Sequence, residues 1–525
     1  MKRIITVFTV LSVCLLFACD SINNSLELAP IDSFASGNFF NNADQVNGNM
    51  LGLHSDLRGM YQGLYMLGES RGGTYIAVPS IMGTSQDQMN PQKSNTFTKE
   101  STGISNWYGY YSPILKVNYF IERVENGCSF LSDAQRGRYL GQAYGIRAYY
   151  YFMLYRTYGG VPVIDRAKVI LDGATSALDL YTPRSTPKQT LDFIKSDILK
   201  SDQYFGSDFS TASNAMWSKS ATLMLKSEIF LWSGKVADGD QTPAGTDIQT
   251  AKDALSQLIG KYSLQPKFED VFAYNNKENN ETIFAFRFIE GEASDGNVGR
   301  YLYQSAWQNR FYSKEGILMG DTLDLRASGG NAQEYRYELF ESFQPNDTRR
   351  DFTFLDFYAH DAEHNIIGKG LILKKNMGIL NANGARVWAT DIPLYRFADV
   401  LLMMAEVENK LGNDPSSYIN QVRARAYGAS YNADEHGHVN GDFEANELAI
   451  LFERDKEFVY EGKRWFDIRR MQDATGRALV FSGAASYYGN GTPVLDYNTK
   501  AYMVLWPIDV TTLNNDPTLE QTLGY

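Results

Sequence analysis

The stretch ERDKEFVYEGKRWFDIRRM, residues 453–471, is the part of this 525-residue chain that is densest in acidic, basic and aromatic side chains. Glu453, Glu457 and Glu461 recur every four residues, so a helix would bring these carboxylates to one face. Catalysis by paired carboxylates needs a cleft, and a single helix offers none. We therefore interpret the stretch as scaffold, in which ion pairs along and between helices occupy a solvated or helix-bridging face. Basic residues alternate with the acids at Arg454, Lys456, Lys463, Arg464, Arg469 and Arg470.

Helical periodicity extends from this stretch through much of the chain. Residues 134–158 carry apolar side chains at spacings of three and four, with Gly141, Gly145 and Ala148 where another helix could approach closely. Many predicted helices form pairs with short connections, which indicates a mostly α fold with a tetratricopeptide-like helical-repeat scaffold. The other predicted helices span residues 43–61, 112–125, 186–202, 214–234, 247–259, 393–411, 415–427 and 443–471.

Two regions interrupt the helices. Residues 61–111 are irregular, and residues 281–392 contain short alternating strands such as TIFAFRF (282–288) and a hairpin candidate at 356–375. Long excursions from a rigid scaffold commonly carry binding residues. We expect one folded domain over residues 36–525, with the scaffold at about 36–60, 112–260 and 393–472 and the ligand-binding elaboration at about 61–111 and 281–392.

The N-terminus is typical of an exported lipoprotein. A short basic start at Lys2 and Arg3 precedes an apolar run that is too short for a stable membrane span, so residues 1–18 are predicted to be a signal peptide. The run ends in LFAC, which favours cleavage before Cys19 and acylation of its sulfur, with cleavage of an ordinary signal peptide nearby as the alternative. Residues 19–35 would then be a lipid-anchored tether.

Charge and cysteine content exclude several classes of protein. The net charge is −12, or about −14 after loss of Lys2 and Arg3, and no basic stripe is present, so nucleic acid is not an expected partner. Cys128 has no expected disulfide partner and is interpreted as a half-buried core residue. Phosphate-binding glycine loops, nucleophile elbows and zinc-ligand clusters are missing from the sequence, and we predict neither cofactor nor metal. HDAEH (360–364) lacks zincin order, and NADEHGHVNGDFE (432–444) is interpreted as a solvated loop rather than a calcium site.

Several motifs, taken in order along the chain, resemble those of SusD/RagB-type outer-membrane lipoproteins. They are the Cys19 lipobox, AYGIRAYYYFMLYRTYGGVPV (143–163), YSLQPKFEDVFAYNNKENNETIFAF (262–286), Asp347-Thr348-Arg349, PLYRFADVLLMMAEVENKLG (393–412), the opening stretch, and YMVLWPIDVTTLNNDPTLEQTLGY (502–525). The resemblance covers essentially the whole chain. It implies a non-enzymatic, surface-exposed lipoprotein that captures oligosaccharides and delivers them to a SusC-like TonB-dependent transporter of the outer membrane. A peptide-binding lid of the RagB branch is the alternative, and a glycoside hydrolase on a helical scaffold is a third.

Aromatic and polar residues in the irregular regions are the candidate ligand contacts. Sugar rings pack their C–H faces on aromatic rings, and their hydroxyl groups need fixed polar partners. The segments GTSQDQMNPQ (83–92), NWYGYY (106–111) and GRYLYQSAWQNRFY (299–312) offer this mixture. For each aromatic residue the alternative role is to anchor its loop on the scaffold. The candidates are Asp87, Asn90, Trp107, Tyr108, Tyr301, Tyr303 and Trp307.

Overall fold

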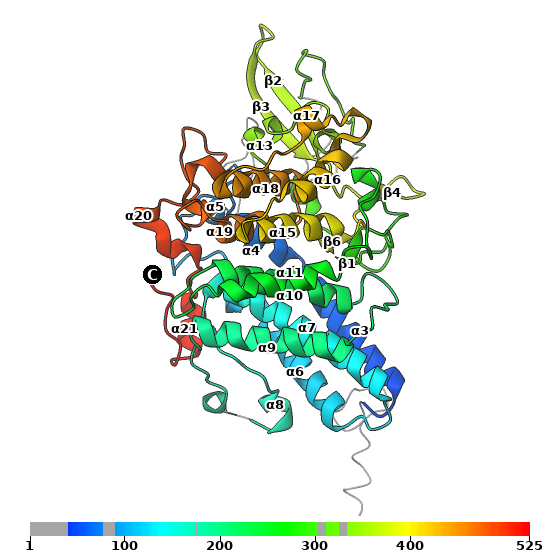
Figure 1. Ribbon diagram of the computed structural model, residues 1–525, viewed down its shortest axis with the longest axis vertical. Helices are drawn as coiled ribbons and strands as arrows, with labels where there is room; N and C mark the ends of the chain where they lie inside the picture. Colours follow the sequence, from blue (N-terminus) through cyan, green and yellow to red (C-terminus); the bar gives the residue numbers. More distant parts are fainter. Residues whose placement is uncertain (1–39, 77–89, 175, 302–310, 325–332) are drawn as a thin grey trace, which may run out of the picture.

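The computed structural model describes residues 40–76, 90–174, 176–301, 311–324 and 333–525 (Figure 1). The protein is mostly helical, as predicted. One connected hydrophobic core contains side chains from Phe40 near the start to Ile508 near the end of the chain. No helix in the described ranges is both long and apolar enough to cross a membrane.

The longer helices in the lower part of Figure 1 pack against one another in chain order, with contacts of α3 to α6, α6 to α7, α7 to α9, α9 to α10 and α10 to α11. Helix α7 lies among α6, α9 and α10, and all of its residues from Leu140 to Tyr158 are buried. A Cβ atom at Gly141 would lie 2.8 Å from the ring of Phe205, and one at Gly145 would lie 2.1 Å from the indole of Trp217. These glycines therefore permit the close approach that the sequence predicted. These six helices are α3 (Ala43–Gly59), α6 (Tyr111–Asn126), α7 (Asp133–Tyr158), α9 (Pro187–Phe205), α10 (Lys219–Lys235) and α11 (Gly245–Ser256).

Local signals set the ends of these helices. Ser132 and Gln135 form a reciprocal capping box at the start of α7, and Thr186 and Gln189 form another at the start of α9. Helix α7 ends at Tyr158 and is followed by Gly159, whose φ of 76° suits glycine. Helix α10 begins later than predicted, at Lys219, because the side chain of Ser218 caps it.

The upper half contains helices α15 (Phe397–Lys410), α16 (Ser416–Tyr427) and α18 (Phe443–Glu457), with a β-hairpin above them (Figure 1). The hairpin prediction is confirmed, since β2 (Phe354–His360) pairs antiparallel with β3 (Ile366–Leu373). The strand predicted within TIFAFRF is also confirmed. It is β1 (Thr282–Phe286), which pairs antiparallel with β6 (Ile392–Arg396), so the helix predicted from residue 393 begins only after that strand. The remaining elements are α4 (Gln62–Gly68), α5 (Asn90–Lys93), α8 (Lys168–Leu171), α13 (Tyr337–Glu341), α14 (Thr348–Thr353), β4 (Ile379–Leu380), β5 (Arg386–Val387), α17 (Ala433–His436), α19 (Arg464–Arg470), α20 (Tyr497–Lys500), α21 (Val510–Asn515) and several short 3₁₀ turns.

The segment 432–444 is not simply a solvated loop. Its first residues form α17, and His436 is buried with its ring stacked on Tyr427 at a centroid distance of 4.0 Å. The loop interpretation is therefore wrong for this part, because an Asn432 cap and an aromatic contact fix it.

The single helix predicted over residues 443–471 is also wrong. Helix α18 ends at Glu457 and α19 begins at Arg464, because Tyr460 (φ 61°) and Gly462 (φ 70°) turn the chain between them. A Cβ atom at Gly462 would lie 2.5 Å from the backbone oxygen of Leu64, so only glycine fits there. Glu461 consequently lies outside the helix.

The prediction of ion pairing in this stretch is confirmed, and of the two predicted positions the helix-bridging face is the observed one, whereas the solvated face is wrong. Glu453, Glu457 and Glu461 are no more than 1% exposed. Glu457 accepts hydrogen bonds from Arg349 at 2.9 Å and from Arg396 at 2.5 Å, and it also pairs with Arg425. Glu461 accepts from Lys375 at 2.6 Å. We call Glu281, Arg349, Lys375, Arg396, Arg425, Glu453, Glu457 and Glu461 the buried ion network.

Nearby arginine side chains keep the carboxylates of Glu453 and Glu457 ionised although both are buried. Burial alone would raise the pKa of Glu453, but Arg349 and the other cations nearby lower it to about 2. The same balance holds the pKa of Glu457 well below its usual range. The network joins α14, β6, α16 and α18, so it fastens the strand-containing elaboration to the upper helices.

Candidate functional site

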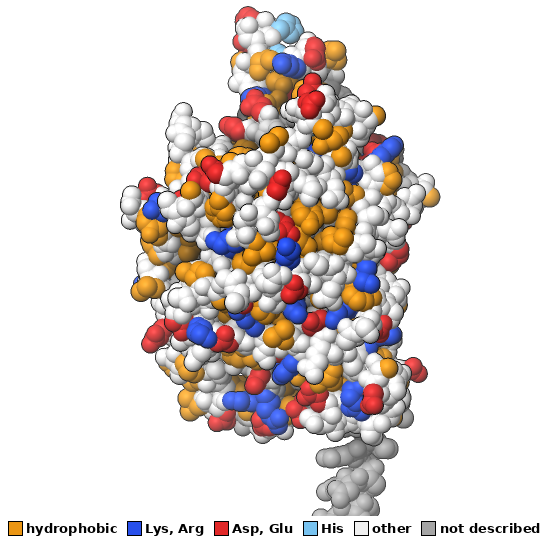
Figure 2. Space-filling view, viewed as in Figure 1, with side chains coloured by type: hydrophobic (Ala, Val, Ile, Leu, Met, Phe, Trp, Pro, Cys, Tyr) orange, Lys and Arg blue, Asp and Glu red, His pale blue; other side chains and the backbone are white. Residues whose placement is uncertain are grey.

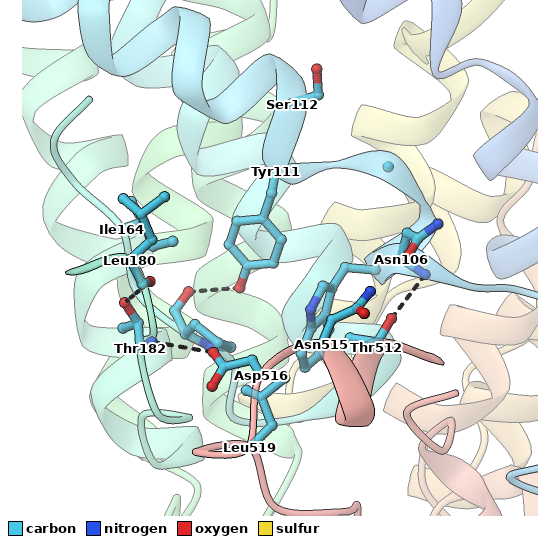
Figure 3. Close-up of a pocket in the computed structure, with 13 residues that line it drawn as sticks. Asn106, Tyr111, Ser112, Ile164, Leu180, Thr182, Thr512, Asn515, Asp516 and Leu519 are labelled. Carbon is cyan, nitrogen blue, oxygen red and sulfur yellow. Dashed lines mark hydrogen bonds between the residues drawn. The ribbon is translucent and has the colours of Figure 1, made fainter. Parts of the chain in front are cut away.

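Two adjoining hollows form a groove where α21 meets the start of α6. Figure 3 draws the residues that line the first of them. Their volumes are about 410 and 250 Å³, and the hollows share Tyr111, Ile164, Leu180 and Thr182. The first is otherwise lined by Asn106, Trp107, Gly109, Ser112, Pro162, Thr512, Asn515, Asp516 and Leu519. We call the joined hollows the groove.

Aromatic rings form one side of the groove. Trp107 lies edge-on to Tyr158 and Tyr111, with ring centroids 4.9 and 5.9 Å apart. The hydroxyl of Tyr111 donates to the backbone oxygen of Pro162 at 2.7 Å, and burial raises the pKa of this tyrosine well above its usual value. Both rings are therefore fixed in position before any ligand arrives.

The backbone beneath Trp107 adopts an uncommon conformation. Asn106, Trp107, Tyr108 and Gly109 have consecutive φ angles of 50°, 54°, 55° and 75°. The left-handed region costs about 1–2 kcal/mol for each residue other than glycine, and such strain clusters at functional sites. The N–H of Asn106 donates to Asp509 Oδ2 at 3.1 Å and to Thr512 Oγ1 at 3.2 Å, which holds the segment to α21.

The wall of the groove that contains Leu180 and Thr182 is held to the C-terminal end of α21. The N–H of Thr182 donates to Asp516 Oδ2 at 3.3 Å, and the Thr182 hydroxyl donates to the backbone oxygen of Leu180 at 3.1 Å (Figure 3). Asp509 also caps α21 through the N–H of Thr512. Asp509 before α21 and Asp516 after it thus each accept a hydrogen bond from one wall of the groove. The side-chain amides of the exposed residues Asn106 and Asn515 lie at the rim.

Of the predicted contacts, the structure places Trp107 in the groove. Tyr108 points elsewhere, since its ring lies 5.8 Å from that of Tyr110 and a Cβ atom at Gly63 would lie 3.1 Å from it. Tyr108 therefore fits the alternative role of anchoring its loop. Asn90 is the first residue of α5 and Tyr301 is the last residue of a 3₁₀ turn, and the structure describes the backbone but not the side chain of each. Asp87, Tyr303, Trp307 and the acylation candidate Cys19 lie outside the described residues.

Sequence reasoning missed most of the groove. Tyr111 belongs to the NWYGYY segment but was not singled out, and Thr182, Asn515 and Asp516 come from distant parts of the chain. The sequence DVTTLNND (509–516) predicts that Asp509 caps the N-terminus of a helix. No local pattern predicts that Asp509 lies beside Asn106. Within the described ranges, no group of three or more His, Cys, Asp or Glu side chains is positioned to hold a metal ion.

Comparison with known proteins gives the family. Residues 369–525 match the family model described as SusD family, and residues 52–231 match one described as starch-binding associating with outer membrane. The crystal structure of a SusD superfamily protein from Bacteroides fragilis is 38% identical, covers 92% of this chain and 99% of its own, and superposes with a TM-score of 0.85. The chain belongs to the SusD family.

Other SusD family members extend this relationship. B. fragilis NanU is 34% identical, with a TM-score of 0.81 over 94% of this chain and 99% of its own. The starch-binding protein SusD of Bacteroides thetaiotaomicron is 23% identical over 96% of this chain and 95% of its own. The resemblance stated from the sequence motifs is therefore confirmed, and it spans nearly the full length of these relatives.

Proposed function

We propose that this protein is a surface lipoprotein that binds an oligosaccharide and delivers it to a SusC-like TonB-dependent transporter in the outer membrane. A relative is a starch-binding protein, and the family model that matches residues 52–231 is described by starch binding and outer-membrane association. Acylation of Cys19 would attach the protein to the membrane and leave the folded body outside the cell.

The observation that carries the binding proposal is the composition of the groove. Tyr111 is partly exposed, and its ring offers a surface for the C–H face of a sugar ring, while Trp107 is 8% exposed and contributes only the part of its ring that lines the hollow. The rim amides of Asn106 and Asn515 can bind hydroxyl groups. Two joined hollows give room for more than one sugar unit. Stacking plus a few hydrogen bonds supports a dissociation constant of about micromolar to millimolar for a short ligand.

Calorimetric titration with a panel of oligosaccharides and peptides tests this proposal. We expect one or more oligosaccharides to bind, and Trp107→Ala to weaken binding by tenfold or more, because the residue contributes the larger ring. Phe230→Ala is a matched control, since Phe230 is 7% exposed, close to the 8% of Trp107, and lies outside the groove. Trp307→Ala tests the other predicted aromatic contact. If a ligand binds and neither tryptophan change weakens it, this site assignment is wrong.

The same panel separates the competing functions. Selective binding of peptides would favour a RagB-type peptide lid. Shortened products after incubation with a bound glycan would indicate a glycoside hydrolase. Among the described lining residues, Asp516 belongs to the first hollow and Asp165 to the second, and Asp516 accepts hydrogen bonds from the N–H groups of Thr182 and Thr518.

Membrane purification tests the partnership. We expect affinity-tagged protein from gently solubilised membranes to bring a large β-barrel protein with it, and Cys19→Ser to release the lipoprotein into the soluble fraction. Recovery of the lipoprotein alone would count against a stable pair with the transporter.

A further inference from the structure

The described chain begins at the end of the molecule that carries α8. The ring of Phe40, the first described residue, lies 5.7 Å from the ring of Tyr119 on α6. Tyr119 and Ile170 of α8 line a third hollow of about 380 Å³. In Figure 1, α8 lies at the end of the molecule opposite the β2–β3 hairpin. An attachment made through the residues before Phe40 therefore reaches the folded body at this end.

The segment around α8 exposes aliphatic side chains at the same end. Val169 and Ile170 are 46% and 43% exposed, and Leu178 is 75% exposed. Neither α8 nor the 3₁₀ turn Ala177–Asp179 contains a buried residue, and Val169 lines the second hollow of the groove together with Leu180. Exposed apolar side chains that cluster in this way mark contacts with a protein or a membrane. We call Val169, Ile170 and Leu178 the apolar tip.

The charges near the apolar tip are mostly paired within the protein. Arg166 pairs with Asp172 at 2.8 Å, and Lys116 pairs with Asp56 at 2.9 Å. The other charged side chains of residues 163–182 are Asp165, Lys168 and Asp179, whose formal charges sum to −1. Exposed paired charges attract a partner only weakly. Binding at the tip must therefore come from burial of its aliphatic side chains.

The chemistry of the apolar tip favours lipid over a protein partner. Protein interfaces concentrate their binding energy in Trp, Tyr and Arg, whereas Leu and Val are under-represented there. Aliphatic side chains can instead bury themselves at the boundary between lipid head groups and acyl chains. The twenty residues 20–39 lie between the acylation candidate Cys19 and Phe40, and a chain of this length spans at most about 70 Å. The anchor thus holds this end of the body nearest to the bilayer.

We propose that the apolar tip inserts into the lipid surface beside the anchor, so that the folded body makes a second contact with the membrane. This inference rests on the acylation of Cys19 in the proposed function. The contact holds the groove next to the bilayer, because Val169 belongs to the tip and also lines the second hollow. Insertion of aliphatic side chains also makes the contact insensitive to salt.

Fluorescence of the acylated mature protein in phosphatidylcholine vesicles tests the insertion. An environment-sensitive dye is attached to Ile170→Cys or Leu178→Cys, while acylation blocks Cys19 and burial protects Cys128. We expect emission to rise about twofold or more in vesicles, and lipids with a doxyl quencher in the acyl chain to reduce it, because the dye leaves water. Ile366→Cys is the matched control, since Ile366 is 47% exposed but lies on β3 at the opposite end, and its emission should stay unchanged.

Flotation of the same samples reports the anchor separately, and circular dichroism shows that each variant is folded. Protein that floats with the vesicles while neither tip dye responds would overturn the insertion and leave the anchor in place. Protein that does not float would overturn the anchor and this inference with it. An equal response at Ile366→Cys, a response lost in about 0.5 M NaCl, or a response that needs the transporter in the same vesicles would each overturn lipid insertion.

Discussion

The buried ion network and the groove use polar residues in opposite ways. In the network, Glu457 and its cationic partners are almost completely buried, and every strong contact is made within the protein. In the groove, fixed rings and rim amides face an open space, and the charged groups of Asp509 and Asp516 hold the walls. The densest cluster of charge is therefore scaffold, and the proposed binding surface depends on rings held by a few hydrogen bonds.

This difference teaches which changes affect stability and which affect recognition. A buried charge that loses its partner is left without solvent, so changes in the network destabilise the whole fold. Changes in the groove alter a surface that already contacts solvent. Charged side chains of both signs are interspersed on the face shown in Figure 2, where exposed pairs contribute little.

The largest expected effect comes from Glu457→Ala. It leaves Arg349, Arg396 and Arg425 without a shared carboxylate in the core, and breaking such a pair costs about 3–5 kcal/mol of unfolding free energy. Urea denaturation measures this cost. Asp192→Ala is the matched control, because Asp192 and its partner Lys188 are both 55% exposed, and we expect a loss of less than about 1 kcal/mol. Equal losses from the two variants would contradict the distinction between buried and exposed pairs.

The next effect concerns pH. Burial raises the pKa of Asp295 to about 6, and the carboxylate accepts hydrogen bonds from Tyr460 and from the N–H of Asn297. The folded state therefore holds a proton that the unfolded state releases near its ordinary pKa of about 4. This stabilisation is fully present below pH 4 and is lost as the pH rises through 6.

Asp295→Asn removes that titration. We expect the unfolding free energy of the variant to fall by about 2–3 kcal/mol less than that of the unaltered protein as the pH is raised from 4 to 8. Denaturation at several pH values measures both slopes. Asp238 and Asp455, whose pKa values burial also raises to about 6, keep part of the slope in the variant. An unchanged slope would contradict the assignment of this proton to Asp295.

The sequence predicts the helical layers because their signals are local. Periodic apolar residues, the capping boxes at Ser132 and Thr186 and the glycine at 159 all act within a few residues. The break at Gly462 was visible as a glycine in a helical pattern, yet its cause is the backbone oxygen of Leu64, nearly four hundred positions away in the chain. No periodicity reports such a contact.

The groove was predictable only in part for the same reason. Trp107 was identified because an aromatic residue in a polar loop suits a sugar, and it does line the groove. The opposite wall comes from residues near 180 and near 512, and these meet only after the helices have packed. The depth to which the charges of residues 453–461 are buried also depends on partners at Arg349, Arg396 and Arg425, which sequence spacing cannot reveal.

A smaller effect is expected from Asp509→Asn. Asparagine still caps α21, but its amide replaces the oxygen that accepts from the N–H of Asn106. We expect a loss of about 1.5 kcal/mol in stability and about fivefold in affinity for the groove ligand, because one strained wall is released. Asp496→Asn is the matched control, since Asp496 caps α20 and is not among the groove residues. Equal affinity losses from both variants would show that capping, and not the wall contact, matters.

The smallest expected effect isolates the backbone strain under Trp107. Gly109 has a φ of 75°, and a Cβ atom there would meet nothing within 4 Å, so Gly109→Ala adds a conformational cost without a clash. That cost is about 1 kcal/mol in unfolding free energy. Gly260→Ala is the control, because Gly260 has a φ of 82° and equally open surroundings but lies outside the groove. Both variants should lose similar stability in urea denaturation, whereas only Gly109→Ala should also weaken the groove ligand, since a segment that relaxes toward negative φ would move Trp107. If Gly109→Ala loses stability with unchanged affinity, the left-handed turn supports the fold alone and contributes nothing to the position of the ring.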